Sequence, residues 1–210
     1  MVDFRLYLVS DRHQCTGRSL IEALTTASEA GVRAVQIREK DLRAGELLAL
    51  SREVQSVTGP RGVRLFINDR ADIARAVGAA GVHLPEAGLT VEAARKALGP
   101  GGLIGVSTHS GEGARRAGQC GADYITFGPV FSTPSKAAFG PPAGVEKLEE
   151  AARAVDLPVF AIGGVRPDRV RACLDAGAHG VAVISAILSA RDVRQAVGRF
   201  RKELGEDTSV

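Results

Sequence analysis

The chain has 210 residues, a mass of 21.9 kDa and a formal net charge of +3. This size suits one folded domain with a sizeable core and lies near the short limit for an eightfold β/α barrel. Aromatic residues make up only 4% of the chain and the arginines are dispersed, so we expect no nucleic-acid surface built on stacking or on a charged patch. No apolar run is long enough to span a membrane, and Met1–Ser10 lacks the pattern of a secretion signal. We therefore expect a cytoplasmic protein without a membrane partner.

Apolar runs alternate with amphipathic segments along the whole chain. The predicted strands are Phe4–Val9, Arg33–Arg38, Val63–Ile67, Ala80–Leu84, Ile104–Val106, Tyr124–Phe127, Val159–Ile162 and Val181–Ile184. The predicted helices are Leu20–Ala30, Ala44–Val57, Ala71–Val77, Val91–Ala97, Gly111–Gln119, Val145–Val155, Pro167–Ala176 and Val193–Leu204. The strands are mostly continuous apolar runs, as in a parallel sheet that is buried on both faces. This order predicts an α/β fold, a (β/α)8 TIM barrel forming one domain over residues 1–210, with a frayed tail at 205–210.

Short polar clusters follow many of the predicted strands, and the carboxyl ends of barrel strands build the active site. Gln36, Arg38 and Lys40 alternate at the end of the second strand, so their side chains point to the same side. The two cations favour a phosphate or pyrophosphate ligand. The alternative is a surface ion-pair ladder with Glu39 and Asp41.

Asn68 and Asp69 follow the third strand. Asp69 could ligate Mg²⁺, which takes few protein carboxylates beside phosphate oxygens and water. The alternative role is a helix cap, but Asp72 fits the cap of the following helix better. That assignment leaves Asp69 for the metal.

The segment Ser132–Gly144 is the one long irregular stretch between predicted elements. It offers two hydroxyls and an ammonium group, from Thr133, Ser135 and Lys136. A long loop on a compact barrel is usually functional and often acts as a lid. We therefore expect these side chains to take part in ligand binding.

Two small-residue turns follow the last two strands. Gly163 and Gly164 end the seventh strand, and Ile184 and Ser185 end the eighth. Backbone N–H groups at these turns form the usual phosphate site of a β/α barrel. The alternative is that the glycines only allow the chain to turn.

Ser107 and two histidines also lie near predicted strand ends. Ser107 is a candidate hydrogen-bond donor to a phosphate. His83 and His109 are expected near the mouth in a packing or supporting role rather than as acid–base catalysts.

As a set, these clusters resemble the thiamine-phosphate synthase and TenI family. The matching segments are VQIREKD (35–41), FINDRADIARAVGAAGVHL (66–84), IGVSTHS (104–110), GADYITFGPVFSTPSK (121–136), AIGGV (161–165) and GVAVISAI (180–187). The family is a β/α barrel, and its synthase branch joins a pyrimidine diphosphate to a thiazole phosphate and releases pyrophosphate. In that branch the amino group of the pyrimidine helps to expel pyrophosphate and leaves a stabilised methylene cation, which the thiazole nitrogen captures.

The resemblance also implies roles for individual residues. The aminopyrimidine would be held by Gln36 and Asn68. The pyrophosphate would be held by Arg38, Lys40, Ser107 and Lys136, with the three cations as the catalytic groups. One Mg²⁺ would be bound by Asp69. The thiazole phosphate would be held by Thr133, Ser135, Gly164, Ile184 and Ser185.

One segment departs from the synthase pattern. After GVHL the synthases typically carry Gly-Gln and then two acidic residues, one of which binds Mg²⁺; here the run is Pro85-Glu86-Ala87-Gly88. The aligned metal carboxylate is therefore missing at Gly88, and Glu86 could reach inward as a second Mg²⁺ ligand. A Leu-Pro pair without the acids resembles the TenI branch, some members of which isomerise the thiazole phosphate. The histidine that such tautomerases can carry is Pro129 here.

Four hypotheses follow from these residues. The first is an Mg²⁺-dependent thiamine-phosphate synthase with an altered metal site, acting on phosphorylated pyrimidine and thiazole substrates. The second is a TenI-like thiazole tautomerase, or a protein that binds the thiazole phosphate without coupling it. The third is a non-enzymatic, ligand-sensing barrel, and the fourth is an unrelated phosphate-binding barrel isomerase. An oligomer is compatible with all four.

Overall fold

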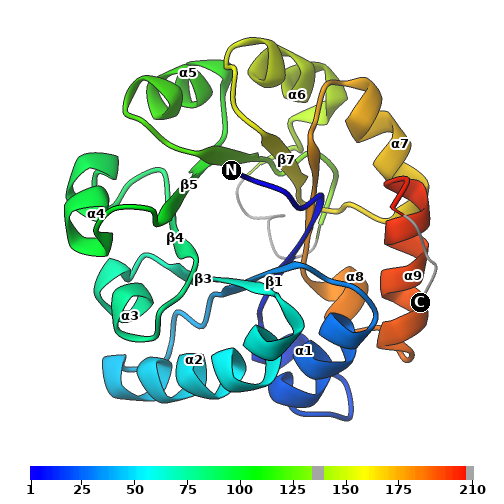
Figure 1. Ribbon diagram of the computed structural model, residues 1–210. Helices are drawn as coiled ribbons and strands as arrows, with labels where there is room; N and C mark the ends of the chain where they lie inside the picture. The colour runs from blue at the N-terminus through cyan, green and yellow to red at the C-terminus, as the bar shows by residue number, and fades with distance from the viewer. Residues whose placement is uncertain (134–139, 207–210) are drawn as a thin grey trace.

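The computed structural model describes residues 1–133 and 140–206. Within them, eight parallel strands close into a barrel in chain order, with β8 pairing back to β1. Helices lie outside the strands and form a surrounding ring (Figure 1). The strands are β1 (Leu6–Val9), β2 (Ala34–Ile37), β3 (Arg64–Asn68), β4 (Gly81–Leu84), β5 (Leu103–Thr108), β6 (Tyr124–Phe127), β7 (Val159–Ile162) and β8 (Gly180–Val183). The predicted TIM barrel is confirmed.

The helices follow the strands in the predicted alternation. They are α1 (Leu20–Glu29), α2 (Ala44–Thr58), α3 (Ala71–Ala76), α4 (Val91–Leu98), α5 (Gly111–Gln119), α6 (Gly144–Arg153), α7 (Pro167–Asp175), α8 (Ser185–Leu188) and α9 (Val193–Glu203). Two short 3₁₀ turns, η1 (Arg12–Gln14) and η2 (Gly59–Arg61), complete the described elements. The described part of the chain contains no helix of the length and apolar character that a bilayer crossing requires.

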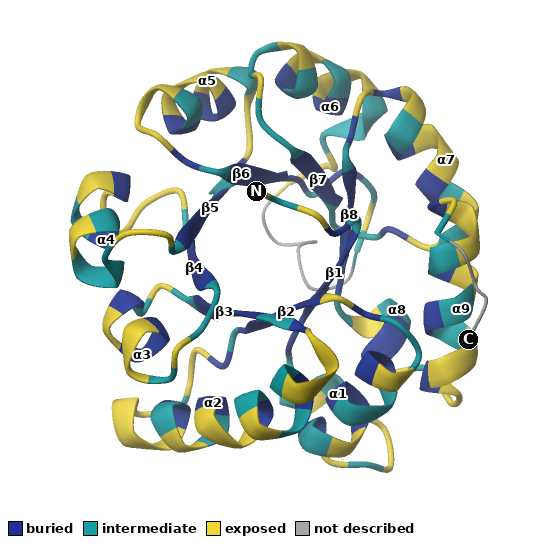
Figure 2. Ribbon diagram, viewed as in Figure 1, coloured by how far each residue is buried: buried dark blue, intermediate teal, exposed yellow. Residues whose placement is uncertain are grey.

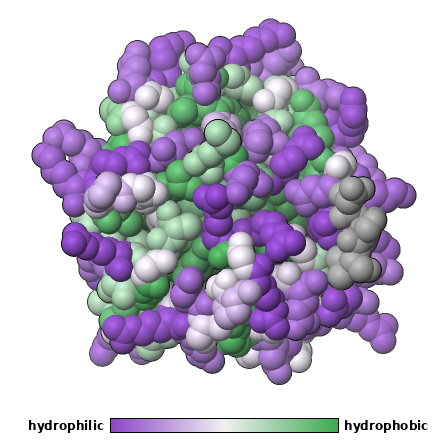
Figure 3. All heavy atoms as spheres, viewed as in Figure 1, coloured by the Kyte–Doolittle hydropathy of each residue, from purple (hydrophilic) through white to green (hydrophobic). Residues whose placement is uncertain are grey.

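The two faces of the strands are buried in different surroundings, because side chains alternate along a strand. One set packs outward under the helices, including Leu8 and Val35. The other set fills the barrel interior with aromatic rings and a few aliphatic side chains. This double burial explains why the strands are continuous apolar runs in the sequence. Figure 2 shows the buried strands surrounded by helices that carry both buried and exposed residues. Figure 3 shows hydrophilic side chains over the outer helices.

The interior rings occupy the amino half of the barrel. Phe4 precedes β1 and is 1% exposed, and its ring centroid lies 5.1 Å from that of Phe160 and 5.7 Å from that of Phe66. In the view of Figure 1 the chain begins within the outline of the strand ring, between the labels of β5 and β7. Gly105 makes room for the Tyr124 ring, since a Cβ atom at this glycine would collide with that ring. The aromatic layer therefore closes the amino end and leaves the carboxyl end for polar groups.

The start of α3 corrects one expectation. Asp72 was predicted to cap this helix, but the N-cap residue is Arg70, and Asp72 lies in the first turn with its carboxylate 2.5 Å from the Arg70 guanidinium. The reason is the backbone of Asp69, which has a φ of 58° and turns the chain sharply into the helix. The predicted cap was wrong, although Asp69 is indeed left out of the helix.

The structure also adds detail at the end of the chain. The turn after β8 continues into the short helix α8, which the sequence did not predict. The backbone N–H groups of Gly205 and Glu206 donate to carbonyl groups of α9, and the Glu206 carboxylate lies 3.3 Å from Arg201. These two residues of the predicted tail are therefore attached to α9, and residues 207–210 lie outside the described part of the chain.

Candidate active site

Strand parity brings the predicted polar residues to one end of the barrel interior. Gln36 is 2% exposed at the end of β2, on the same face as the interior side chains. Asn68 and His83 are paired in register at the ends of β3 and β4. Ser107 and Thr126 are likewise paired on β5 and β6. Each of these residues lies two positions beyond an interior residue of its own strand, so together they form a polar layer above the aromatic one.

Arg38 extends this layer toward the mouth. Its backbone N–H donates to Ser10 Oγ at 2.9 Å, and its side chain is half-buried. Its guanidinium makes no hydrogen bond or ion pair with any other residue in the described ranges. Its positive charge still reaches the barrel interior, because it contributes to lowering the pKa of His83. Arg38 thus presents an uncompensated cation near the polar layer.

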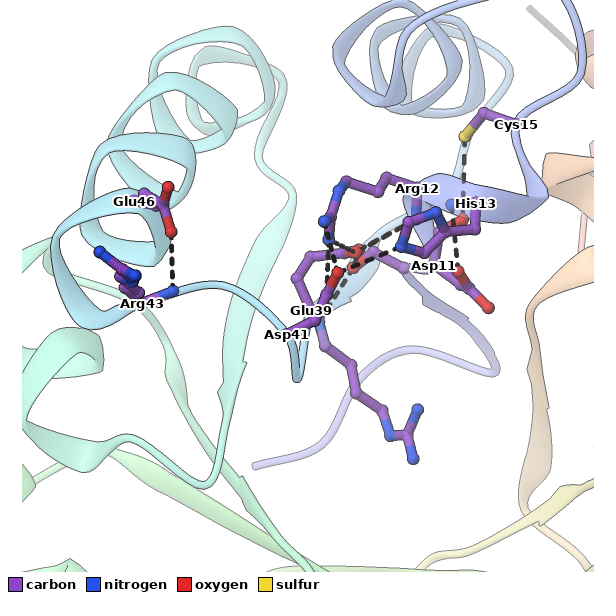
Figure 4. A network of polar contacts seen from close by, with 10 residues as sticks. Asp11, Arg12, His13, Cys15, Glu39, Asp41, Arg43 and Glu46 are labelled. Atoms are coloured by element: carbon purple, nitrogen blue, oxygen red, sulfur yellow. Dashed lines mark hydrogen bonds and ion pairs between the residues drawn. The ribbon is translucent and has the colours of Figure 1, made fainter.

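The neighbouring acids are paired elsewhere, with Arg12 of the β1–α1 connection (Figure 4). The Glu39 side chain is 2% exposed, and one of its oxygens lies 3.1 Å from Arg12. Asp41 lies 2.5 Å from the same guanidinium, and hydrogen bonding from Arg12 and then from His13 holds the Asp41 pKa well below its usual range. Arg38 therefore takes no part in the ion-pair ladder given above as the alternative, and Glu39 and Asp41 both pair with Arg12.

Asp69 stands at the mouth after β3 with an unusual backbone. It is the one non-glycine residue of the described ranges with a positive φ. This conformation costs about 1–2 kcal/mol for most residues with a side chain, and aspartate is one of the few that adopt it. The Asp69 N–H donates to the His83 carbonyl at 2.9 Å. A Cβ atom at Gly88 would lie 3.1 Å from Asp69 Oδ1 and 2.8 Å from the Pro85 ring. The Asp69 carboxylate therefore faces position 88, where this chain carries no side chain.

Glu86 is directed toward α5. Its carboxylate lies 3.6 Å from the Arg116 guanidinium and 4.0 Å from His109 Nε2, and it is 30% exposed. Gly113, in the first turn of α5, leaves room for it, since a Cβ atom there would collide with the Glu86 carboxylate. His109 Nδ1 in turn donates to the Gly128 carbonyl. No group of three or more His, Cys, Asp or Glu side chains in the described ranges is arranged to hold a metal ion.

A buried hydrogen-bond chain underlies the polar layer. Gln36 Nε2 donates to Tyr7 Oη at 3.1 Å, and the hydroxyls of Tyr7 and Tyr124 lie 2.9 Å apart. His83 Nδ1 lies 3.3 Å from Tyr124 Oη, and His83 Nε2 lies 3.0 Å from Ser107 Oγ. Burial raises the pKa of both tyrosines. Burial and then the charge of Arg38 lower the pKa of His83 to about 3, so the imidazole is neutral near pH 7.

The segment after β6 lies against the turn after β7. The Phe131 N–H donates to the Gly163 carbonyl at 3.0 Å. Gly164 has a φ of 64°, and a Cβ atom there would lie 2.5 Å from the Ser132 carbonyl oxygen. A side chain at position 164 is therefore excluded both by the backbone and by the neighbouring segment. This packing places Phe131 and Ser132, directly before Thr133, against the glycine turn.

The other predicted residues of this region are placed less completely. Ile184 is the N-cap residue of α8, and Ser185 is its exposed first residue. Ser135 and Lys136 lie outside the described residues, so their predicted roles stay predictions. The backbone carbonyl of Gly164 accepts a hydrogen bond from Arg169 at 2.7 Å, and the Arg169 guanidinium lies 4.8 Å from the centre of the Phe131 ring.

Sequence reasoning missed Tyr7, Tyr124 and Arg12. Strand parity could have found the tyrosines, because Tyr7 lies two residues before Val9, the in-register partner of Gln36, and Tyr124 lies two residues before Thr126. The Arg12 contacts had no such signal, since this residue lies in a connection outside the regular strands.

A closed β/α barrel with polar side chains gathered at the carboxyl ends of its strands belongs to the class of barrel enzymes.

Comparisons with known proteins narrow this class. The family model described as thiamine monophosphate synthase matches residues 6–187. A relative from Geobacter sulfurreducens called putative thiamine-phosphate synthase is 52% identical over 92% of this chain and 91% of its own. The thiamine-phosphate synthase of Roseiflexus castenholzii is 42% identical over 89% of this chain and 82% of its own. The structure of thiamine phosphate pyrophosphorylase from Pyrococcus furiosus is 35% identical, covers 96% of both chains and superposes with a TM-score of 0.87. The chain therefore belongs to the thiamine monophosphate synthase family.

Proposed function

We propose that this chain is a thiamine-phosphate synthase, a transferase that condenses hydroxymethylpyrimidine diphosphate with thiazole phosphate and releases pyrophosphate. The observation that carries the proposal is the polar layer of Gln36, Asn68 and Ser107 beside the uncompensated Arg38, in a chain that is 42% identical to a relative named for this activity. These residues supply amide groups for a heterocycle and a cation for a diphosphate at one end of one barrel.

Expulsion of pyrophosphate is the step in which the cations would act. Negative charge grows on the leaving group, and fixed positive groups aimed at that charge lower the barrier. Arg38 would meet it from β2, and Lys40 and Lys136 would complete the cationic set, with Ser107 donating a hydrogen bond. Because Glu39 and Asp41 are paired with Arg12, they do not neutralise Arg38.

The second task is alignment of the two rings. Gln36 and Asn68 would hold the aminopyrimidine through their side-chain amides, which both donate and accept hydrogen bonds. Thr133, Ser135, Gly164, Ile184 and Ser185 would hold the thiazole phosphate. Fixing both ligands places the thiazole nitrogen next to the pyrimidine methylene carbon, so the reaction no longer depends on a chance encounter.

A magnesium ion fits this site only with the help of the substrate. Mg²⁺ usually keeps several waters and binds one or two protein carboxylates together with substrate phosphates. The Asp69 carboxylate is exposed at the mouth and faces Gly88, which offers no second carboxylate. Glu86, the other ligand expected from the sequence, would have to leave Arg116 and His109 to join it. When bound, the ion would neutralise part of the pyrophosphate charge.

The direct test is product formation. Purified protein is incubated with both substrates and Mg²⁺, and thiamine phosphate and pyrophosphate are measured; omission of either substrate is the control. We expect both products in equal amounts. Absence of thiamine phosphate at saturating substrate and Mg²⁺ would overturn the proposal.

The loss of the acidic pair at Ala87 and Gly88 favours a second candidate, a TenI-like tautomerase or a protein that binds the thiazole phosphate without coupling it. The same incubation without the pyrimidine substrate decides this. Interconversion of thiazole phosphate isomers without coupling would favour the tautomerase, and binding without any turnover would favour the binding protein.

A further inference from the structure

A single line of hydrogen-bonding groups crosses the barrel from Gln36 to Ser107. The links are Gln36 to Tyr7, Tyr7 to Tyr124, Tyr124 to His83 and His83 to Ser107, with distances of 3.1, 2.9, 3.3 and 3.0 Å. Tyr7 and Tyr124 are fully buried, and His83 is 2% exposed. The chain therefore joins two residues of the proposed substrate site through groups that water does not reach.

The number of protons on each group fixes the direction of this hydrogen-bond chain. Gln36 Nε2 donates to Tyr7 Oη, so the one proton of Tyr7 is left for Tyr124. The one proton of Tyr124 is then left for His83 Nδ1, which must accept it. His83 consequently carries its proton on Nε2 and donates to Ser107 Oγ. The Ser107 hydroxyl accepts this bond and keeps its own proton for a further partner.

Reversal of the Gln36 amide would reverse every link. The carbonyl oxygen of Gln36 would then accept from Tyr7, Tyr7 from Tyr124, and Tyr124 from His83. Ser107 would donate its proton to His83 and present only lone pairs to a ligand. An anion is attracted by the first arrangement and repelled by the second, so the orientation of one amide decides what Ser107 offers.

We propose that Tyr7, Tyr124 and His83 are positioning residues that transmit the orientation of the Gln36 amide to the Ser107 hydroxyl, which then donates a hydrogen bond to the leaving diphosphate and keeps its proton. The identity of the diphosphate rests on the proposed function. Gln36 Oε1 makes no hydrogen bond within the described ranges, which leaves it to accept from a ligand amino group. An aminopyrimidine bound there holds the amide in the productive orientation and so prepares Ser107 for the diphosphate of the same molecule.

Neighbouring residues of the barrel pack closely around this hydrogen-bond chain. Gly105 is required for the Tyr124 ring, because a Cβ atom there would overlap the ring and its hydroxyl. Phe66 packs against both tyrosine rings, with centroids at 5.4 and 5.6 Å, and holds them without adding a polar group. Thr126 Oγ1 is the other described hydroxyl near His83 Nε2, at 3.4 Å, which is longer than the contact with Ser107.

The first experiment reads the tautomer of His83 in the wild-type protein without substrate, by two-bond ¹H–¹⁵N correlation spectra. We expect the proton on Nε2 and an unprotonated Nδ1. A proton on Nδ1 that stays there after the pyrimidine diphosphate is added without the thiazole would mean that ligand binding at Gln36 does not set the direction, and it would overturn the proposed relay from Gln36 to Ser107. This result does not depend on catalysis, so it judges the relay even where product formation fails.

The second experiment is a double-mutant cycle on kcat/KM for the pyrimidine diphosphate. Ser107→Ala and Tyr124→Phe should each lower it about tenfold, the size expected when a hydrogen bond to a charged group is lost or weakened. Because Tyr124 acts through Ser107, the double variant should be no worse than Ser107→Ala. Multiplying losses, about 100-fold together, would indicate an independent packing role and overturn the relay.

Controls separate the relay from packing. Phe66→Leu alters the same aromatic layer without touching a hydrogen bond, and its effect should multiply with that of Ser107→Ala. Tyr7→Phe breaks the chain one link earlier and should again be silent in the Ser107→Ala background. Denaturant unfolding of each variant checks folding, and if a tyrosine variant does not fold, the wild-type tautomer decides.

Discussion

The carboxyl ends of β2 and β4 hold charge in opposite ways. After β2, the two acids are each paired with Arg12, and Arg38 makes no ion pair with another described residue. After β4, the acid is the paired group: Glu86 lies by Arg116 and His109, and position 88 has no side chain. The β2 end thus presents a positive group to a ligand, whereas the β4 end leaves Asp69 as the facing carboxylate. The difference suggests that leaving-group stabilisation depends more on protein cations than on a metal held by the protein.

The largest expected effect is at Arg38. Arg38→Ala should lower kcat/KM about 100-fold, because removal of one group that stabilises transition-state charge typically costs a factor of 10² to 10³. Arg33→Ala is the matched control just before the opposite end of β2, where the exposed guanidinium donates to the Arg61 carbonyl and makes no other hydrogen bond or ion pair in the described ranges. It should leave activity within twofold. Steady-state kinetics measure both, and wild-type activity in Arg38→Ala would remove the β2 cation from the mechanism.

A variant at Glu39 tests whether this buried carboxylate stabilises the carboxyl end of β2. This carboxylate accepts from Ser10 Oγ at 2.5 Å and from the Arg12 backbone and guanidinium. Glu39→Gln should lower the unfolding free energy by about 2 kcal/mol, as expected for hydrogen bonds to a charged group. Asp41→Asn is the comparison on the same arginine and should shift the urea midpoint less, because Asp41 is exposed. Equal shifts would show that burial of Glu39 is not what matters.

The barrel could be predicted from the sequence, because the patterns that indicate strands and helices are local. Eight apolar runs separated by amphipathic helices are enough to order the strands, and the two-residue period places Gln36 inside. Contacts between distant segments carried no such signal. Tyr7 and Tyr124 are 117 residues apart, and Arg12 and Glu39 are 27 apart, so their pairing depends on strand register and on the path of a connection.

The cap of α3 illustrates a different limit. Asp72 has the residue type and position of a cap, but the left-handed backbone of Asp69 starts the helix earlier. An aspartate with positive φ is uncommon, and no local pattern required it here. Strain of this kind is often retained at functional sites, which agrees with the proposed role of Asp69.

His83 lies beneath the β4 end, and its charge state can be followed through stability. Burial and the Arg38 charge lower its pKa from 6.5 to about 3. Between these two pKa values the unfolded chain binds a proton at His83 that the folded chain does not bind. The stability that depends on a neutral His83 is therefore fully present above pH 6.5. It is lost as the pH falls toward 3, by at most about 1.4 kcal/mol per pH unit. Urea unfolding from pH 7 to 4 should show a smaller loss for His83→Gln than for wild type. Equal slopes would contradict a neutral, buried His83.

Gly88 offers a way to add a second acid to the β4 end. In Gly88→Asp a second carboxylate would stand beside Asp69, and one more charge near the ion is worth about 1 kcal/mol, or about fivefold, in a hydrated site. The Mg²⁺ concentration for half-maximal coupling should fall by that factor, despite crowding against the Pro85 ring. Gly88→Asn, with the same shape and no charge, is the control. An equal gain in both variants would assign the effect to the loop and not to the metal.

Glu86 gives the smallest expected effect and decides between two roles for the β4 acid. If its carboxylate stays with Arg116 and His109, Glu86→Gln removes only partly exposed ion pairs, which contribute less than about 1 kcal/mol. We expect the Mg²⁺ requirement for coupling to change less than twofold. A metal ligand would behave differently, because loss of its charge would raise that requirement at least as much as Gly88→Asp lowers it. Arg116→Gln removes a partner of Glu86 while keeping the carboxylate, and so frees Glu86 to turn toward Asp69. A lower Mg²⁺ requirement in Arg116→Gln, together with a higher one in Glu86→Gln, would show that Glu86 replaces the carboxylate missing at Gly88.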